Sequence, residues 1–137
     1  RKFGYDANWL QDYIYMRAAE MILIKAEAEA RLGNNGPAAT TLKVLMAQRD
    51  PGFGKGSVTV EDVLLQRRIE LWGEGFHYFD LRRNGLGTVR NYEGSNHPEW
   101  ARKDFAPHAL SFRFQIPLRE IQENTEINEE DQNEWTL

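Results

Sequence analysis

The sequence predicts an all-α protein in which helical hairpins are followed by an irregular, partly extended C-terminal segment. Apolar residues recur at helical spacing over residues 12–49 and again over residues 59–83, whereas glycines and prolines interrupt every candidate element from Gly85 to Ser111. The chain of 137 residues is also short enough to predict one compact domain. We therefore expect a helical hairpin at 12–49, a helical region at 59–83 and an irregular segment at 84–137.

The first predicted helix runs from Asp12 to Leu32, because this stretch has no glycine or proline and is rich in strong helix formers. The turn Gly-Asn-Asn-Gly at residues 33–36 ends it. Pro37 suits the first position of a second helix, which ends near Arg49. Two helices joined by so short a turn form an antiparallel hairpin, the unit that tetratricopeptide arrays stack, so we expect a TPR-like hairpin.

A third helix is predicted to follow Thr59, because Thr59 and Asp62 have the spacing of a capping box. A short fourth helical segment is expected at residues 76–83, after two glycines that weaken the end of the third helix. Three aromatic residues at helical spacing are expected to pack inward, namely Trp72, Phe76 and Phe79.

The C-terminal segment shows one further pattern. Residues 110–116 alternate apolar and polar side chains, which predicts a short half-buried strand or extended segment that Pro117 ends. The tail from Glu120 to Glu134 carries seven acidic residues and no basic one, so we expect solvated surface there.

Composition excludes several classes of function. With 17 basic and 21 acidic residues the net charge is −4, so we expect no nucleic-acid partner. The chain has no cysteine and hence no disulfide, thiol nucleophile or thiolate zinc site. Its longest apolar run, residues 21–24, is far shorter than the roughly 20 residues of a membrane-spanning helix.

No catalytic motif is present in the sequence. We find no Gly-x-Ser-x-Gly elbow, phosphate-binding loop or dinucleotide fingerprint. The helical carboxylates also lack the separation across a cleft that a general acid and base need. We therefore expect a protein that is not an enzyme, with no catalytic residue and no cofactor.

Glu74 and His77 form the Glu-x-x-His pair that carboxylate-bridged di-metal bundles use. Such a site needs a second copy of the motif, but neither His97 nor His108 has a glutamate three residues before it. We therefore expect no metal site and interpret these charges as ion pairs.

Ion pairs between helices explain the charged residues better than catalysis does. Glu70 and Glu74 lie one helical turn apart and would repel each other, so each needs a cationic partner. We expect Glu70, Glu74 and Asp80 to pair between helices with Arg17, Arg68, Arg82 or Arg83. The predicted ion-pair residues are Arg17, Glu20, Glu27, Arg68, Glu70, Glu74, Asp80 and Arg82.

The chain contains 16 aromatic residues, and flat rings can stack on sugars or supply rigid contact area at an interface. Most are expected in the core. Tyr92 and Trp100 instead lie among glycine, asparagine, histidine and proline in the irregular segment. These two are our candidates for carbohydrate binding.

Three ordered motifs carry a resemblance to a known family. They are Arg17-Ala-Ala-Glu20 with Lys25-Ala-Glu27, then Arg67-Arg68-Ile-Glu70-Leu-Trp-Gly-Glu74-Gly75, and Phe79-Asp80-Leu81-Arg82-Arg83. Together with the closing segment from Phe114 to Asn124, they resemble the C-terminal region of the SusD/RagB family. The closing turn departs from the family pattern, because Gln132-Asn133 is followed by Glu134 where Pro-Gly is usual.

The resemblance implies a lipoprotein exposed on the cell outer membrane that captures glycans or other nutrients for a TonB-dependent (SusC-like) transporter. It also implies that residues 1–137 are a C-terminal fragment of a SusD-like domain, with the remainder of its own polypeptide as a partner. The matched charged residues are implied as scaffold positions and not as ligand contacts. The chain opens without an initiator methionine or a secretion segment, which agrees with a fragment whose anchor lies elsewhere.

A second class of function stays open. A stand-alone helical-repeat adaptor would use a concave groove to bind a peptide or a partner protein. A nutrient-binding module would show exposed aromatic residues instead.

Overall fold

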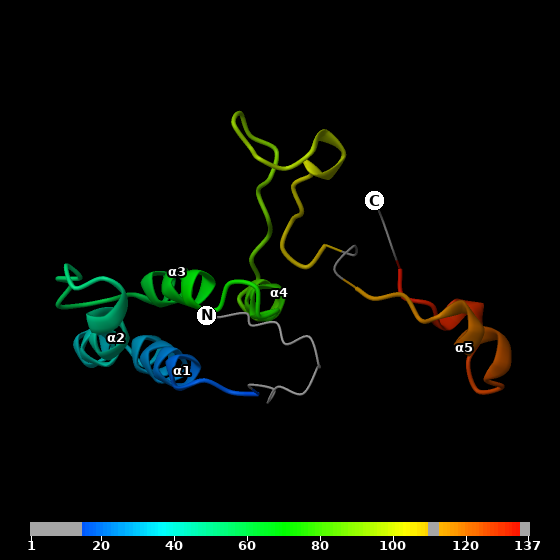
Figure 1. The fold of residues 1–137 in the computed structure, drawn as a ribbon. Helices are drawn as coiled ribbons and strands as arrows, with labels where there is room; N and C mark the ends of the chain where they lie inside the picture. Colours follow the sequence, from blue (N-terminus) through cyan, green and yellow to red (C-terminus); the bar gives the residue numbers. More distant parts are fainter. Residues whose placement is uncertain (1–14, 110–112, 135–137) are drawn as a thin grey trace, which may run out of the picture. The chain divides into compact units, whose positions relative to one another are not determined.

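The fold is all-α, as the sequence predicts. A computed structural model describes residues 15–109 and 113–134, and these residues form helices but no β-strand (Figure 1). In the described part, one antiparallel bridge joins Thr88 and Phe105. The TPR-like type of the hairpin stays a prediction. The helical elements are α1 (Ala18–Arg31), α2 (Asn35–Arg49), α3 (Val60–Glu70), α4 (Phe76–Arg83), the 3₁₀ turn η1 (Glu99–Ala101), α5 (Leu118–Glu123) and the 3₁₀ turn η3 (Glu129–Asp131).

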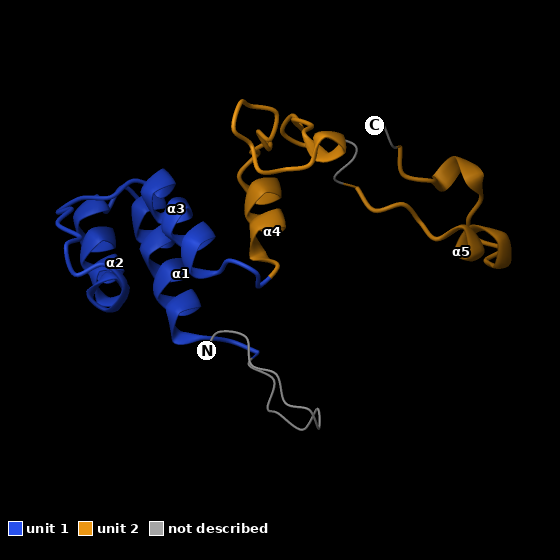
Figure 2. Cartoon of the chain, turned by 45° about the horizontal axis from the view of Figure 1, so that its top comes forward, with its two compact units in different colours: residues 1–74 blue, residues 75–137 orange. Residues whose placement is uncertain are grey.

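The chain divides into two compact units, residues 1–74 and residues 75–137 (Figure 2). The length alone predicts a single compact domain, so this division is a difference from expectation. Its local cause lies between α3 and α4, where Gly73 and Gly75 adopt positive φ angles of 80° and 82° and interrupt the helical run.

In the first unit, α1 packs against both α2 and α3. The buried positions of α1 include three alanines, whose small side chains let the neighbouring helices approach closely. Leucine and valine side chains then fill the space between the helices. The buried apolar residues of the three helices and their flanks are Ala19, Leu23, Ala26, Ala30, Ala38, Ala39, Leu42, Leu45, Met46, Val58, Val63 and Leu71.

The directions of the three helices follow from their connections. The short turn after α1 makes α2 antiparallel to it. The Val58 N–H donates a 3.1 Å hydrogen bond to the carbonyl of Asn35, so the start of α3 lies beside the start of α2. Helix α3 therefore runs in the same direction as α2. The start of α1 and the ends of α2 and α3 consequently meet at one end of the unit.

Two helix starts differ from the sequence prediction. Helix α1 begins at Ala18 and not at Asp12, because Arg17 is its N-cap and has extended backbone angles, φ −123° and ψ 145°. Residues 12–14 lie outside the described residues. Helix α2 begins at Asn35, so Pro37 falls within its first turn, where the missing N–H costs no helical hydrogen bond.

The start of α3 agrees with the prediction. The N–H of Asp62 donates to Thr59 Oγ1 at 3.3 Å, and the N–H of Thr59 donates to Asp62 Oδ2 at 3.0 Å. A capping box is thereby formed.

The expected inward packing of three aromatic residues is wrong for two of them. Trp72 is 72% exposed and Phe79 is 64% exposed, whereas Phe76 is half-buried. The buried side of α4 is formed by Asp80 and Leu81 instead. Helical spacing therefore indicated a shared face without indicating which face is buried.

The extended C-terminal segment is paired by side chains and not by a strand. Residues 110–112 lie outside the described residues, and 113–116 form no strand. The Ile116 N–H donates to Gln132 Oε1 at 2.8 Å, and Gln132 Nε2 donates back to the Ile116 carbonyl at 3.1 Å. Asn133 Nδ2 likewise donates to the Phe114 carbonyl at 2.8 Å. The side-chain amides of Gln132 and Asn133 thus form hydrogen bonds with the backbone of this extended segment.

Within the described residues, no helix combines the length and the apolar character needed to cross a membrane.

Replacing Thr59 by alanine removes one half of the capping box. We expect the free energy of unfolding to fall by about 1 kcal/mol, as for other N-cap threonines. Urea unfolding followed by far-UV circular dichroism measures the change. The control is Thr40→Ala in α2, which removes an exposed hydroxyl bonded to the Gly36 carbonyl but no cap. Equal effects of the two substitutions would contradict the capping role.

Candidate functional site

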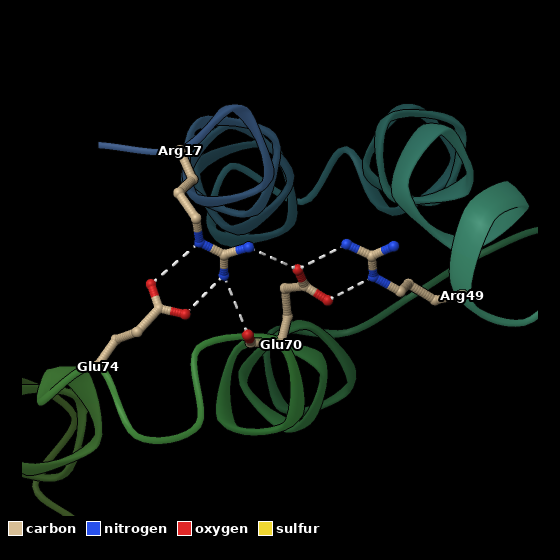
Figure 3. Close-up of polar contacts among 4 residues, drawn as sticks. All are labelled: Arg17, Arg49, Glu70 and Glu74. Atoms are coloured by element: carbon tan, nitrogen blue, oxygen red, sulfur yellow. Dashed lines mark hydrogen bonds and ion pairs between the residues drawn. The ribbon is translucent and has the colours of Figure 1, made fainter. Parts of the chain in front are cut away.

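The end of the first unit where α1, α2 and α3 meet carries a cluster of four charged residues, Arg17, Arg49, Glu70 and Glu74 (Figure 3). Arg17 bonds Glu74 with two nitrogens, at 3.1 Å from Nε and 2.7 Å from Nη2. It also donates to Glu70 Oε1 and to the Glu70 carbonyl, both at 3.1 Å. Arg49 bonds both oxygens of the Glu70 carboxylate, at 2.8 and 3.1 Å. We call these four residues the three-helix charge cluster.

The cluster is partly shielded from solvent. The side chains of Arg17, Glu70 and Glu74 are 24%, 11% and 20% exposed. Hydrogen bonds from Arg49 and then Arg17 hold the pKa of Glu70 below its usual range, although burial acts in the opposite direction. Burial lowers the pKa of Arg17, but its hydrogen bonds to Glu74 and Glu70 outweigh that effect and leave it raised. Every carboxylate oxygen in the cluster accepts from a guanidinium, which suits a structural role better than general-base chemistry.

A second set of ion pairs lies between α1 and α3. Glu27 accepts two hydrogen bonds from Arg31, one turn further along α1, at 2.9 and 2.8 Å. Its other oxygen lies 3.7 Å from Arg67 Nε of α3, and both side chains of this pair are 6% exposed. Glu27 therefore links α1 to α3 from within the core.

The other predicted ion-pair residues are placed differently. Asp80 is buried, but its contact with Arg83 at 2.7 Å lies within α4 and not between helices, because the residues are one turn apart. Arg82 donates to the Tyr78 hydroxyl at 3.4 Å, also within α4. Glu20 is half-buried and Arg68 is exposed, and neither forms an ion pair with any residue the structure describes.

Arg49 is the cluster member that the sequence analysis missed. A signal for it existed, because a cation in the last turn of the second helix of an antiparallel hairpin lies beside the start of the first helix. What could not be read from the sequence is that the end of α3 reaches the same place.

The two candidate sugar-binding residues, Tyr92 and Trp100, lie in a separate feature of the second unit. Residues 88–105 leave and return through the Thr88–Phe105 bridge, and we call them the aromatic lobe (Figure 1). Tyr92 is 53% exposed and Trp100 is 80% exposed. Just outside the bridge, a Cβ at Gly87 would lie 2.2 Å from the Phe105 carbonyl oxygen, so only glycine fits there.

Polar contacts cross the aromatic lobe. Asp104 Oδ1 accepts from the backbone N–H groups of Arg90 at 2.6 Å and Asn91 at 2.9 Å. These N–H groups, Asn91 first and then Arg90, hold the pKa of Asp104 below its usual range. The Arg102 guanidinium donates to the carbonyls of His97 at 2.9 Å and Ser95 at 3.1 Å. No motif or spacing in the sequence pointed to Asp104 or Arg102.

In the part of the chain that the structure describes, no group of three or more histidine or acidic residues is arranged to hold a metal ion.

Comparison with known proteins places this chain in a family of binding proteins. The model of the SusD family matches residues 6–135, so the chain belongs to that family. A solved structure described as a SusD-like carbohydrate binding protein from Bacteroides vulgatus is 28% identical, with a TM-score of 0.64. That match covers 94% of this chain and 32% of the other, so the chain spans about a third of the length of the protein it matches. No curated protein matches the chain.

The free energy of unfolding lost on substituting a glutamate of the three-helix charge cluster should increase with the number of arginines that it binds. We expect Glu70→Ala to lower the free energy of unfolding by about 2–3 kcal/mol, because two arginines lose a partly buried partner. Glu74→Ala should cost less, about 1–2 kcal/mol. Urea unfolding measures both.

The control for these substitutions is Glu123→Ala, which breaks an exposed pair with Arg119. It should cost at most about 0.5 kcal/mol. If Glu74→Ala costs no more than this control, Glu74 has no scaffold role.

Acid should weaken the same cluster. The folded pKa of Glu70 is below its unfolded value, so the unfolded state takes up the proton first as the pH falls. The stability from Glu70 is therefore complete above the unfolded pKa, near pH 4.3, and is lost as the pH falls through the folded pKa. Unfolding midpoints measured from pH 7 to pH 3 should fall more steeply in the wild type than in Glu70→Gln. Parallel curves would show that Glu70 is not responsible.

Proposed function

We propose that this chain is part of a cell-surface protein that captures carbohydrate, and that Tyr92 and Trp100 of its aromatic lobe provide the stacking surface. The observation that carries this proposal is their exposure on a lobe whose backbone is tied by polar contacts. Exposed rings on a fixed backbone can contact a sugar at low entropic cost. Family membership and the carbohydrate-binding description of the Bacteroides vulgatus protein support a saccharide as the ligand.

The charged residues have a scaffold role in this proposal. In both the three-helix charge cluster and the Glu27–Arg67 pair, a carboxylate and a guanidinium from different parts of the helical unit contact each other. The paired carboxylates of these two sets suit a structural role better than acid or base chemistry.

The remainder of its own polypeptide is the proposed partner of an apolar face of α3. Leu65 and Ile69 lie one turn apart on the side of α3 away from the core, and Trp72 follows just after the helix ends; all three are exposed. Apolar faces of this kind mark interaction sites. The matched SusD-like protein is about three times as long as this chain, so further polypeptide of a similar protein could pack on this face.

The proposed setting is the outer face of the cell outer membrane, with a TonB-dependent (SusC-like) transporter as the partner that receives the sugar. The support for this finer statement is the resemblance of the motifs and the family match. A gene for such a transporter immediately upstream would agree with it, and its absence from the locus would count against it. A peptide-binding adaptor stays the alternative, and peptide binding without sugar binding would favour it.

Alanine substitutions in the aromatic lobe test the proposal. We expect Tyr92→Ala and Trp100→Ala each to weaken binding of a hexasaccharide by about three- to tenfold, as the loss of one aromatic contact implies. Isothermal titration calorimetry with maltohexaose, cellohexaose and xylohexaose measures the affinities. The matched control is Trp72→Ala, just after α3, which removes an indole of similar exposure outside the lobe.

Three outcomes would contradict the proposed function. They are no binding of any of the three sugars, full affinity in both lobe variants, and hydrolysis of the sugar.

A further inference from the structure

We propose that Asp104 and Arg102 are the positioning residues of this sugar site: they fix Tyr92 and Trp100 without contacting the ligand. This inference rests on the proposed function and specifies how the site keeps its shape. It assigns a role to two polar side chains that the sequence analysis did not single out.

The aromatic lobe needs such residues because helices and strands do not fix its shape. Between its bridged ends, Thr88 and Phe105, the described backbone has one 3₁₀ turn, η1, and otherwise irregular structure. Ser95 is the one residue of the lobe that is buried. An apolar core therefore cannot order the lobe, and its polar contacts have to do so.

Asp104 fixes the chain segment that carries Tyr92. Its Oδ1 accepts from two consecutive N–H groups, those of Arg90 and Asn91, and Tyr92 follows directly. A carboxylate that accepts from two backbone N–H groups restricts both peptide planes at once. Asp104, on the returning part of the lobe, thereby restrains the backbone from which the Tyr92 side chain projects.

Arg102 fixes the turn that carries Trp100. Its guanidinium reaches back over η1 to the carbonyls of Ser95 and His97, while the Ala101 N–H donates to the Pro98 carbonyl at 2.8 Å. The backbone at Trp100 therefore lies in a short loop that the Arg102 contacts and the Ala101–Pro98 hydrogen bond both close. The Ser95 N–H also donates to the Tyr92 carbonyl at 3.1 Å, which links the two segments.

Both contacts start from one short run of chain, residues 102–104. This run therefore bonds both to the backbone beside Tyr92 and to the turn that holds Trp100. We expect it to fix how these two segments lie relative to each other. A sugar that stacks on both rings needs that relative position before it binds, and a lobe that must order on binding loses affinity.

The test compares Asp104→Ala with Asp104→Asn in the whole chain, with the hexasaccharide that binds wild type best as the probe. Asp104→Ala should weaken binding about tenfold, since the Tyr92 segment then orders only on binding. Asp104→Asn keeps an acceptor oxygen and should recover most of that loss. Arg102→Lys, which cannot bond two carbonyls in the same way, should weaken binding to a similar extent.

The matched control is Asp50→Ala. Asp50 Oδ1 also accepts from a backbone N–H, that of Gly52, but in a loop of the first unit. It should leave the affinity unchanged. An equal loss in Asp50→Ala would show a general effect on folding and would overturn the positioning role.

A double-mutant cycle separates positioning from direct contact. If Asp104 acts through the rings, Asp104→Ala should have no further effect once Tyr92 and Trp100 are both alanine. A further loss in that background would mean that Asp104 contacts the sugar or supports the fold, and would overturn the inference.

Failure of this inference is distinguishable from failure of the proposed function. Should the ring substitutions weaken binding while Asp104→Ala does not, the sugar site stands and the positioning role falls. If none of the three sugars binds, the proposed function falls with the site that the inference needs. Amide hydrogen exchange at Arg90 and Asn91 should rise in Asp104→Ala, and unchanged exchange would overturn the contact itself.

Discussion

The carboxylate of Glu70 is the point on which the helical unit depends. It lies at the end of α3 and accepts hydrogen bonds from Arg17, the N-cap of α1, and from Arg49, the last residue of α2. One acidic group therefore ties three helix ends, each from a different part of the sequence. Arg17 also reaches Glu74 beyond α3, so the cluster extends over the residues that follow the helix. The apolar core gives the unit most of its stability, and we expect the cluster to contribute to the register in which the helices pack.

The second unit is ordered by a different kind of interaction. Its described residues bury only Asp80, Leu81 and Ser95, so side-chain burial contributes little to its order. Backbone groups are instead satisfied by side chains. Asp104 does this in the aromatic lobe, and Gln132 does it for Ile116 in the C-terminal segment. Such contacts determine local shape, but each is modest in free energy, and water competes for it.

Local signals were sufficient to predict α1 to α4, although not where α1 and α2 begin, whereas α5 was not predicted. The capping box at Thr59, the turn after α1 and the extent of α4 could all be predicted from neighbouring residues, because the interactions that form them span a few residues. Arg17 was among the partners predicted for Glu70, but Arg49 was not, since it reaches Glu70 through the relative directions of three helices. The exposure of Trp72 could not be predicted, because spacing defines a face and not what covers it. Asp104 gave no signal at all, since its partners are backbone groups, which every sequence has.

This contrast bears on how a binding site can vary on such a scaffold. A substitution at Glu70 disturbs three helices at once, whereas a substitution at Tyr92 changes an exposed ring on a lobe that contributes little buried surface. We expect the lobe to tolerate different side chains at its surface provided that the contacts of Asp104 and Arg102 remain and that glycine stays at residue 87, where any side chain would meet the Phe105 carbonyl. Under the proposed function, ligand preference and fold depend on separate sets of residues, which is the arrangement expected when function is carried by loops on a rigid framework.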